Sequence, residues 1–235
     1  MKLRNSHELL TGNLLIEGRL LDASNATLFG QINNAIGESF AVVYKPIAGE
    51  RPLWDFPEGS LAGREVAAFE LSSHLGFNCV PTTVMRDGPF GRGAVQQWID
   101  TPTDLDFIML AQQETTEMRN MALFDVVANN TDRKFGHILF TADGDVYGCD
   151  HGVTFHEEFK LRTVLWQFAG QPLNAAEIDQ LENVINWLTS PAAAVFREYI
   201  NDVEQEALLK RVEKLIEEGF PYPSQEWPAV PWPPV

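Results

Sequence analysis

The segment NMALFDVVANNTDRKFGHILFTADGDVYGCDHGVTFH, residues 120–156, carries the strongest pattern in the sequence. Apolar residues at helical spacing, opened by a Thr cap, predict a helix that ends near residue 130. A polar loop, Asn130–His137, follows the helix. After the loop, a strand-like run predicts a β-hairpin with Asp143-Gly144 at its turn. The segment therefore predicts a helix, a polar loop and a hairpin in direct succession.

Two carboxylates of this segment are candidates for chemistry. Asp132 lies in the polar loop, where a carboxylate can orient an acceptor hydroxyl and take its proton. Asp150 ends the second strand of the hairpin, in Asp150-His151-Gly152, and the hairpin returns it to the neighbourhood of Asp132. Paired carboxylates of this kind suit a magnesium site. Taken singly, the first motif also fits a helix-ending loop and the second a strand-ending turn.

The first hundred residues predict strands and one helix. Short β-branched and aromatic runs, separated by turn-forming residues, are typical of an antiparallel sheet. Ser60 is the expected N-cap of the helix, and Gly76 is expected to end it. The expected strands cover 14–21, 26–32, 40–46, 80–88 and 91–100, the last two joined by a turn at Asp87-Gly88, and the expected helix covers 61–76.

The remainder is expected to be helical, with helices over 174–190 and 190–220. The tail, residues 221–235, is rich in proline and tryptophan and cannot form regular structure. It is expected either to pack as an extended strap or to be a mobile segment that binds a partner. These patterns predict an α+β, two-lobed fold: a strand-rich nucleotide-binding lobe over 1–99, a helical lobe over 100–221 with the catalytic and metal loops, and the tail over 222–235.

Lys45 and Glu65 complete an ordered set with the two aspartates. Lys45 ends a predicted strand, and Glu65 lies twenty residues later on the predicted helix. In phosphoryl transfer a strand lysine holds phosphate oxygens and a helix carboxylate holds the lysine. Glu70 is the alternative partner, but it points in another direction on the helix, so we expect Glu65. Taken singly, each residue also fits a solvated surface charge.

Composition argues against some classes of function. The formal net charge is −16, from 33 acidic and 17 basic residues, which disfavours nucleic-acid binding. No run of 18 apolar residues predicts a membrane span, and the N-terminus lacks the pattern of a secretory signal. Cys79 and Cys149 form neither a disulfide framework nor a zinc pattern. We therefore expect a cytoplasmic protein with no integral membrane association.

The loops of this sequence resemble those of a known family. The string NTDRKFGHIL…VYGCDHGVTFH is similar to the catalytic and metal loops of phosphoinositide 3-/4-kinase-like proteins, and its Asn-Thr-Asp also resembles the catalytic loop of HipA-type kinases. A wider resemblance, over roughly residues 12 to 173, is to an actinobacterial branch of uncharacterised phosphatidylinositol-kinase-like proteins. It rests on SNATLFG, VYKPIAGERPLWDFPEGSLAGREVAAFE, VQQWID and MALFDVVANNTDRKFGHIL.

The resemblance implies an ATP site between two lobes, with Mg²⁺ or Mn²⁺. It implies that Lys45 binds phosphate, that Glu65 holds the Lys45 side chain in place, and that Asp132 is the catalytic-loop acid. Metal ligands would be Asp150 and His137, the latter at the position where kinases usually have asparagine. The remaining residues implied for the nucleotide are Ser24, Asn25 and Thr27 in a phosphate loop, and Gln96, Gln97, Trp98 and Ile99 in a hinge that faces adenine through its backbone.

Three departures from the family pattern shape the expected function. The sequence has no G-x-G-x-x-G loop, which excludes an ordinary eukaryotic-type protein kinase. An imidazole at His137 weakens one magnesium position or favours manganese. Few uncompensated cations follow Gly152, so the expected acceptor is a protein or small-molecule hydroxyl rather than a phosphoinositide. The alternatives are a nucleotide-binding pseudokinase or scaffold, and a kinase-fold enzyme that transfers AMP.

Overall fold

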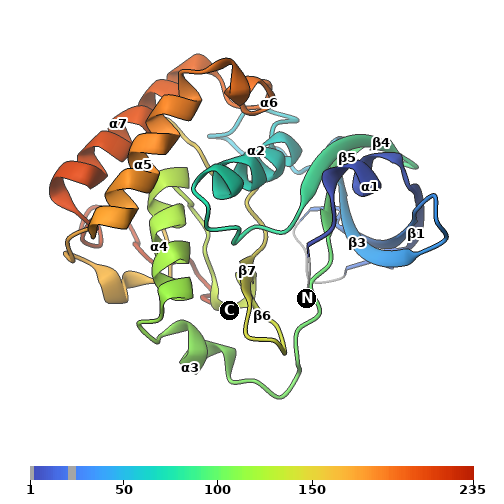
Figure 1. Ribbon diagram of the computed structural model, residues 1–235, viewed down its shortest axis with the longest axis horizontal. Helices are drawn as coiled ribbons and strands as arrows, with labels where there is room; N and C mark the ends of the chain where they lie inside the picture. The colour runs from blue at the N-terminus through green and yellow to red at the C-terminus, as the bar shows by residue number, and fades with distance from the viewer. Residues whose placement is uncertain (1–2, 21–24) are drawn as a thin grey trace.

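A five-stranded antiparallel sheet forms the first part of the computed structural model, which describes residues 3–20 and 25–235 (Figure 1). The strand order is β1-β2-β3-β5-β4, so the strand that carries Lys45, β3, lies at the centre. This sheet was expected from the short alternating runs. Its strands are β1 (Asn13–Arg19), β2 (Leu28–Asn33), β3 (Ser39–Pro46), β4 (Thr83–Gly88) and β5 (Gly91–Gln97).

The two faces of the sheet differ because side chains alternate along each strand. Val42 and Tyr44 of β3 are fully buried, and they cluster with Leu9 of the short helix α1 (Ser6–Thr11). Lys45 and Val43 point to the opposite face and remain partly exposed. One face is therefore core, and the other is available for a site. The helix α1, which has an Asn5–Glu8 capping box, was not predicted.

Helix α2 (Leu61–His74) lies between the sheet and the other helices, and it contacts β4, β5, α5 and α6 (Figure 1). Its expected N-cap is wrong, since the Ser60 side chain makes no cap hydrogen bond. The Glu50 carboxylate instead accepts from the amides of Leu61 and Ala62, at 3.2 and 2.8 Å. Gly76 follows the helix with φ of 74°, as expected for a terminator.

Helices dominate the second part of the chain, with a small hairpin inserted among them. Their apolar faces form one core cluster that includes Phe124 and Phe196, and Phe155 from the loop after β7 joins it. The elements are α3 (Phe107–Ala111), α4 (Thr116–Ala128), β6 (Ile138–Phe140), β7 (Val146–Gly148), α5 (Ala175–Leu188), α6 (Ala194–Arg197) and α7 (Asp202–Glu218), with 3₁₀ turns at Ile47–Gly49, Phe135–His137, Trp166–Phe168 and Pro191–Ala193. No helix of the described residues is both long and apolar enough to span a membrane.

Two local expectations were wrong. The continuous helix expected over 190–220 is broken before α7, because Asn201 and Glu204 form a capping box that begins a new helix. The turn between β4 and β5 was placed two residues too early. Gly88 pairs with Gly91, so the turn itself is Pro89-Phe90. The hairpin expected after residue 137 is present as β6 and β7.

The tail packs against the helical part as an irregular strap, one of the two arrangements left open. Ala229 O accepts from the Thr163 amide and from the Trp166 indole, at 3.0 and 2.9 Å. Pro234 O accepts from the amide of Phe135, at 2.8 Å. The end of the tail is thereby hydrogen-bonded to the loop that contains Asp132.

Candidate active site

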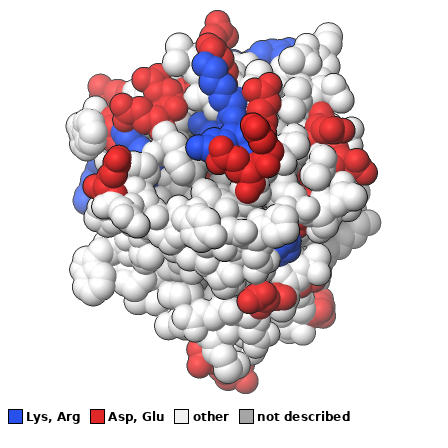
Figure 2. Space-filling view, turned by 90° about the vertical axis from the view of Figure 1, so that its left-hand side faces the viewer, with Lys and Arg blue, Asp and Glu red and all other residues white. Residues whose placement is uncertain are grey.

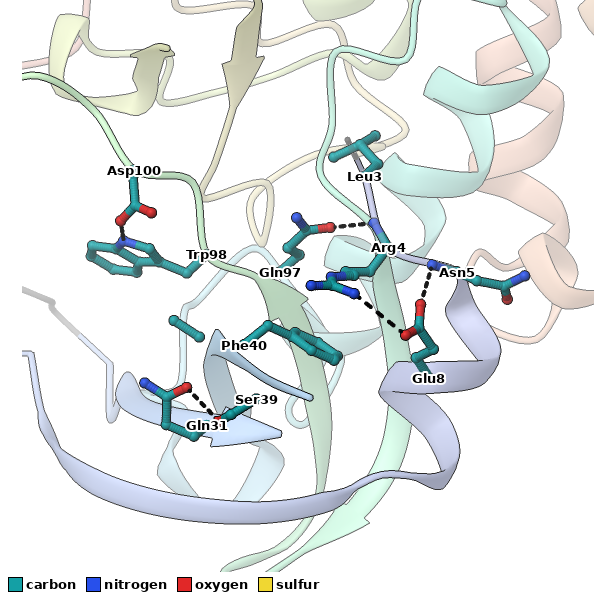
Figure 3. A pocket seen from close by; sticks show the side chains of 11 residues that line it. Leu3, Arg4, Asn5, Glu8, Gln31, Ser39, Phe40, Gln97, Trp98 and Asp100 are labelled. Atoms are coloured by element: carbon teal, nitrogen blue, oxygen red, sulfur yellow. Dashed lines mark hydrogen bonds and ion pairs between the residues drawn. The ribbon is translucent and has the colours of Figure 1, made fainter. Parts of the chain in front are cut away.

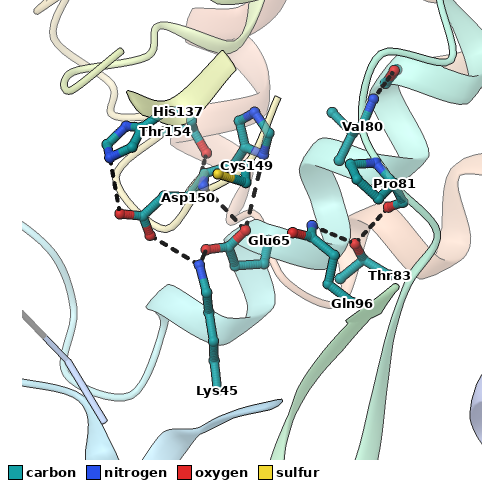
Figure 4. A network of polar contacts seen from close by, with 12 residues as sticks. Lys45, Glu65, Val80, Pro81, Thr83, Gln96, His137, Cys149, Asp150 and Thr154 are labelled. Carbon is teal, nitrogen blue, oxygen red and sulfur yellow. Dashed lines mark hydrogen bonds and ion pairs between the residues drawn. The ribbon is translucent and has the colours of Figure 1, made fainter. Parts of the chain in front are cut away.

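Lys45 joins the sheet to α2 and to the loop after β7. Its Nζ donates to Glu65 Oε1 and, at 2.9 Å, to Asp150 Oδ1 (Figure 4). These residues are 20 and 105 positions from Lys45 in the chain. The amide of His151 donates to the other Glu65 oxygen at 3.1 Å, so both oxygens of this carboxylate are used. Glu70, the alternative partner, does not bind Lys45 in the described structure.

The charges of this group support one another. The pKa of Asp150 lies well below its usual range, chiefly because of the Lys45 charge, which outweighs the effect of burial. Burial alone would lower the pKa of Lys45, but the charges of Asp150 and Glu65 raise it overall. Burial raises the pKa of Glu65, against the Lys45 charge. At neutral pH the site holds a charged lysine and an ionised Asp150.

A buried ion pair supports the loop that contains Asp132. Asp125 on α4 and Arg133 in the loop are both fully buried, and the guanidinium donates to both Asp125 oxygens at 2.9–3.1 Å. Asp125 also accepts from Asn130 at 2.9 Å and from Thr163 at 3.2 Å. Removing either member of a buried pair is costly because it leaves an uncompensated charge. Asp125 therefore holds the loop, in line with the structural role considered for it from the sequence.

Arg133 also connects this loop to the segment of Asp150. Its Nη2 donates to His151 Nε2 at 2.8 Å, and its Nη1 donates to Cys149 O at 3.3 Å. Asp150, between these two residues, has φ of 60°, a left-handed conformation that is uncommon for a residue with a side chain. Strained residues persist where their surroundings hold them, and they cluster at functional sites.

His137 bridges the two loops. Its Nδ1 donates to the backbone oxygen of Asp132 at 2.9 Å, and its Nε2 lies 3.6 Å from Asp150 Oδ2. Burial lowers the pKa of His137, although the charge of Asp150 opposes the shift. A neutral imidazole that donates from Nδ1 has a free lone pair on Nε2, which is suited to a metal.

These donors fit a divalent ion only in part. Asp150 Oδ2 and His137 Nε2 face each other, but no group of three His, Cys, Asp or Glu side chains among residues 3–20 and 25–235 could hold a metal. An ion held by two protein ligands needs further oxygens, which nucleotide phosphates commonly supply. The nitrogen donor favours manganese over magnesium.

Asp132 lies at the surface of this group. Its side chain is 32% exposed, and one oxygen lies 3.4 Å from Lys134 Nζ. Its amide donates to Asn130 Oδ1 at 3.0 Å, and this hydrogen bond forms a turn that fixes the start of the loop. The carboxylate is therefore accessible to an incoming molecule, whereas its backbone is held on both sides by Asn130 and His137.

The expected phosphate-loop residues lie beside Lys45. Asn25 and Thr27 line a small cavity of about 40 Å³ together with Lys45, Glu65 and Asp150. Ser24 lies outside the described residues. Glu50, which sequence reasoning missed, lines the same cavity. Only part of a triphosphate would fit inside a cavity of this size.

The expected hinge residues are only partly available to a nucleotide. The amides of Gln97 and Trp98 already donate to Thr82 O at 2.9 Å and Ala41 O at 3.0 Å. The side chains of Gln96 and Gln97 are engaged as well, with Thr83 Oγ1 and the Arg4 amide. Ile99 is buried. An adenine edge would therefore have to use other backbone groups of this segment.

A larger cavity, of about 940 Å³, opens next to the hinge (Figure 3). Trp98 lines it from the Lys45 face of the sheet, whereas Arg4 and Phe40 line it from the other side. It therefore extends around the end of β3 rather than along the Lys45 side chain.

The sheet face that carries Lys45 has an apolar surface that sequence reasoning missed. Val43 lies two residues before Lys45, and Phe29 is its partner on β2. The Phe29 ring meets the Trp98 ring edge to face, with centroids 5.2 Å apart. All three are half-buried, as expected of a wall that a flat ligand can cover. The strand alternation was the signal that could have found Phe29 and Val43.

Comparison with known proteins gives a close relative. The chain is 38% identical over 261 aligned positions to protein Rv2133c of Mycobacterium tuberculosis. The alignment covers 96% of this chain and 93% of the relative. The chain belongs to the Rv2133c family. No family model matches the sequence.

Solved structures show the fold. Hydra Fam20, solved with sugar, has a TM-score of 0.62 at 12% identity, covering 91% of this chain and 86% of the other. The Golgi casein kinase with Mn/ADP bound has a TM-score of 0.58 at 14% identity, covering 91% and 74%. The Helicobacter pylori proinflammatory kinase CtkA has a TM-score of 0.52 at 12% identity, covering 89% and 94%. These likenesses confirm the expected α+β, two-lobed, atypical kinase-like fold.

Proposed function

We propose that this protein is an ATP-dependent phosphotransferase that acts on a protein or small-molecule hydroxyl. The observation that supports this function best is the contact of Lys45 with both Glu65 and Asp150, from three separate parts of the chain. It occurs in a kinase-like fold, and a lysine–helix carboxylate pair beside a metal-binding aspartate is the arrangement that protein kinases use for phosphoryl transfer.

Each residue then has a role in the reaction. Lys45 binds phosphate oxygens, and Glu65 fixes its ammonium in place. Asp150 and His137 would hold a divalent ion, Mg²⁺ or Mn²⁺, which neutralises phosphate charge. Asp132, exposed at the surface of the group, orients the acceptor hydroxyl and accepts its proton. The cavity that contains Asn25 and Thr27 receives the phosphates.

The apolar surface of the sheet offers a position for the nucleotide base. We propose that adenine lies against Phe29, Val43 and Trp98, with residues 1–99 as the nucleotide-binding lobe. The helical lobe, 100–221, supplies the catalytic and metal loops, and residues 222–235 are the tail. Aromatic and apolar side chains commonly line such pockets, with few polar groups to set orientation.

An inositol phosphate fits this environment poorly as the acceptor, because Lys160, which follows the metal loop, is paired with carboxylates. Lys160 Nζ lies 3.3 Å from Asp55 and 3.1 Å from Glu158. A hydroxyl acceptor without several phosphates fits this environment better. The finer relationship to phosphoinositide 3-/4-kinase-like and HipA-type kinases is a hypothesis that rests on the loop sequences.

The test is ATP turnover with Mg²⁺ and with Mn²⁺. Lys45→Met and Asp150→Ala should each reduce turnover by roughly a hundredfold or more, because each removes a charge that binds phosphate or metal. Asp179→Asn, an exposed position on α5, is the matched control and should behave as wild type. Equal turnover in wild type and Asp150→Ala under both metals would exclude the proposed activity.

A pseudokinase is the second candidate, and His137 in place of an asparagine oxygen favours it. Nucleotide binding that raises the melting temperature without phosphate release would support this alternative. AMP transfer would use the same residues with ATP in the opposite orientation. The intact mass of reacted protein separates the two transfers, since an added AMP is much heavier than a phosphate.

A further inference from the structure

The short helix α3 and the residue before it expose large apolar side chains to solvent. Their exposed fractions are 36% for Leu105, 38% for Phe107, 37% for Ile108 and 55% for Met109. Ala111, at the end of the helix, is buried and attaches α3 to the core of the helical part. Single exposed apolar residues are normal, but a group of neighbouring ones marks a surface that another molecule covers.

A groove runs along this group. It has a volume of about 190 Å³, with Leu105 and Phe107 on one side and Ile138 and Phe140 of β6 on the other. Helix α3 contacts both β6 and the 3₁₀ turn Phe135–His137. Small-molecule pockets usually exceed about 300 Å³, so this groove is better suited to single side chains of a larger partner.

The segment that carries the groove is acidic. Between Arg92 and Arg119 the sequence contains five carboxylates and no lysine or arginine. These are Asp100, Asp104, Asp106, Glu114 and Glu117. In the described parts of the chain, none of the five belongs to an ion pair. Toward the bottom of Figure 2, the level at which α3 lies in Figure 1, the charged side chains in view are acidic.

This charge restricts the molecules that can cover the groove. A second copy of this chain would bring the same carboxylates together across a symmetric contact, which is repulsive. Anionic lipids and nucleic acids would be repelled as well. A protein segment with apolar and basic side chains complements the surface in both respects, because its cations face carboxylates that have no cation of their own.

The groove also lies next to the candidate active site. Gly136 lines it and is four residues after Asp132, in the same loop. Lys134, the cation of this loop that lies between them, is 3.4 Å from Asp132 and so does not neutralise the groove. A protein bound along α3 is therefore held beside the carboxylate to which we assign the acceptor hydroxyl.

We propose that the groove between α3 and β6 docks a partner protein through a segment that combines apolar and basic side chains. Apolar side chains of the segment enter the groove beside Phe107 and cover Ile108 and Met109. Its lysine or arginine side chains lie against the carboxylates on either side of Leu105. The groove residues have no role in the proposed phosphoryl transfer, so docking can be measured without nucleotide and does not depend on that activity.

The probe is a short fluorescein-labelled peptide in which leucine and lysine alternate. Its fluorescence anisotropy should saturate with a Kd of about 50 µM or tighter. Two matched peptides, one with serine for leucine and one with glutamate for lysine, should each bind at least tenfold more weakly. The absence of saturation up to about 500 µM, or equal binding of either matched peptide, would overturn the proposal.

A change in the apolar surface locates the binding. The double variant Ile108→Gln, Met109→Gln removes two exposed apolar side chains and should weaken binding of the leucine–lysine peptide at least tenfold. Val203→Gln, at an exposed position on α7, is the matched control and should leave the Kd unchanged. An unchanged Kd in the double variant would also overturn the proposal.

A change in charge gives an independent test. The variant Asp104→Asn, Asp106→Asn should weaken the peptide several-fold, and asparagine at 106 can still cap α3. The control Glu182→Gln, Glu213→Gln removes the same charge from exposed positions on α5 and α7 and should have little effect. Equal weakening by the two pairs would show that the peptide responds only to net charge, and it would overturn the assignment to α3.

Discussion

At the scale of single residues, the hydrogen bonds of His151 determine its protonation. Its Nε2 accepts from Arg133, so the ring is neutral and carries its proton on Nδ1. That Nδ1 lies 3.9 Å from Glu65 Oε2 and has no hydrogen-bond partner. Burial, followed by the charge of Arg133, lowers the pKa of His151 well below its usual value. The fully buried ring thus links the ion pair of Asp125 and Arg133 to the group of Lys45.

This state of His151 predicts an acid-sensitive stability. Below pH of about 6.5 the unfolded chain protonates this histidine and the folded chain does not, so stability falls as the pH falls. The free energy of unfolding should lose about 1.4 kcal/mol per pH unit for this residue. His151→Gln, which can still accept from Arg133, should reduce the slope between pH 6 and 5. Urea unfolding in EDTA measures it, and an unchanged slope would contradict the assignment.

The sequence allowed the ordered set to be found, but not the contacts that support it. Lys45 lies on a recognisable strand, Glu65 lies on a recognisable helix, and Asp150 follows a recognisable hairpin. The position of Glu65 nearer the helix start was enough to prefer it to Glu70. The hydrogen bond from Arg133 to His151 depends on two loops folding against each other. A local sequence pattern does not indicate such a contact. The engaged amides of Gln97 and Trp98 could not be foreseen for the same reason.

At the scale of elements, the cap of α2 comes from a residue distant in the chain. Glu50 binds the first amides of the helix, whereas the Ser60 hydroxyl donates to Pro57 O. Glu50→Ala should therefore lower the free energy of unfolding by about 1 kcal/mol, the usual cost of a lost cap. Ser60→Ala should cost clearly less. Urea unfolding of both variants measures the difference, and the reverse order would show that Ser60 is the cap after all.

Helix α2 is also tied to α7 by a buried ion pair. Arg64 binds the Glu204 carboxylate, and its Nη1 donates to Thr154 O at 2.7 Å. Glu204→Gln should destabilise the protein by about 3 kcal/mol or more, since it leaves the buried guanidinium without a counter-ion. Glu206→Gln breaks an exposed pair with Lys210 on the same helix and should cost less than about 1 kcal/mol. Equal effects in urea unfolding would contradict this difference.

Element boundaries were predicted where local signals agreed and missed where a cap overrode them. The Thr115 cap of α4 is present as expected. Apolar spacing over 190–220 suggested one helix, but the capping box of Asn201 and Glu204 divides it. The short α1 is held by its own capping box and by Leu9 in the sheet core, a long-range contact that six residues of sequence do not reveal.

At the scale of the whole molecule, the tail is part of the folded structure. The sequence left open whether it packs or moves, because proline-rich segments make few hydrogen bonds of their own. In the structure, Ala229 and Pro234 accept three hydrogen bonds from Thr163, Trp166 and Phe135.

Deletion of residues 222–235 should therefore lower the stability. The loss of the three hydrogen bonds should cost about 3 kcal/mol, before any loss of apolar burial. Trp232→Ala, at a position that is 85% exposed, is the control and should leave the melting temperature within about one degree of wild type. A truncated protein that melts at the wild-type temperature would show that the strap contributes nothing.

The attachment of α2 has a consequence for how such a protein can be controlled. In protein kinases the helix that carries the glutamate is repositioned to switch activity on and off. Here, Gly63 lies so close to Tyr199 that an added Cβ would come within 2.9 Å of the tyrosine ring, and Arg64 is locked into the neighbouring helical layer. An inactive state made by swinging α2 outward would require this interface to unfold. Lys45, Glu65 and Asp150 are thus already in contact in this structure, and an outward swing of α2 would be a costly way to separate them.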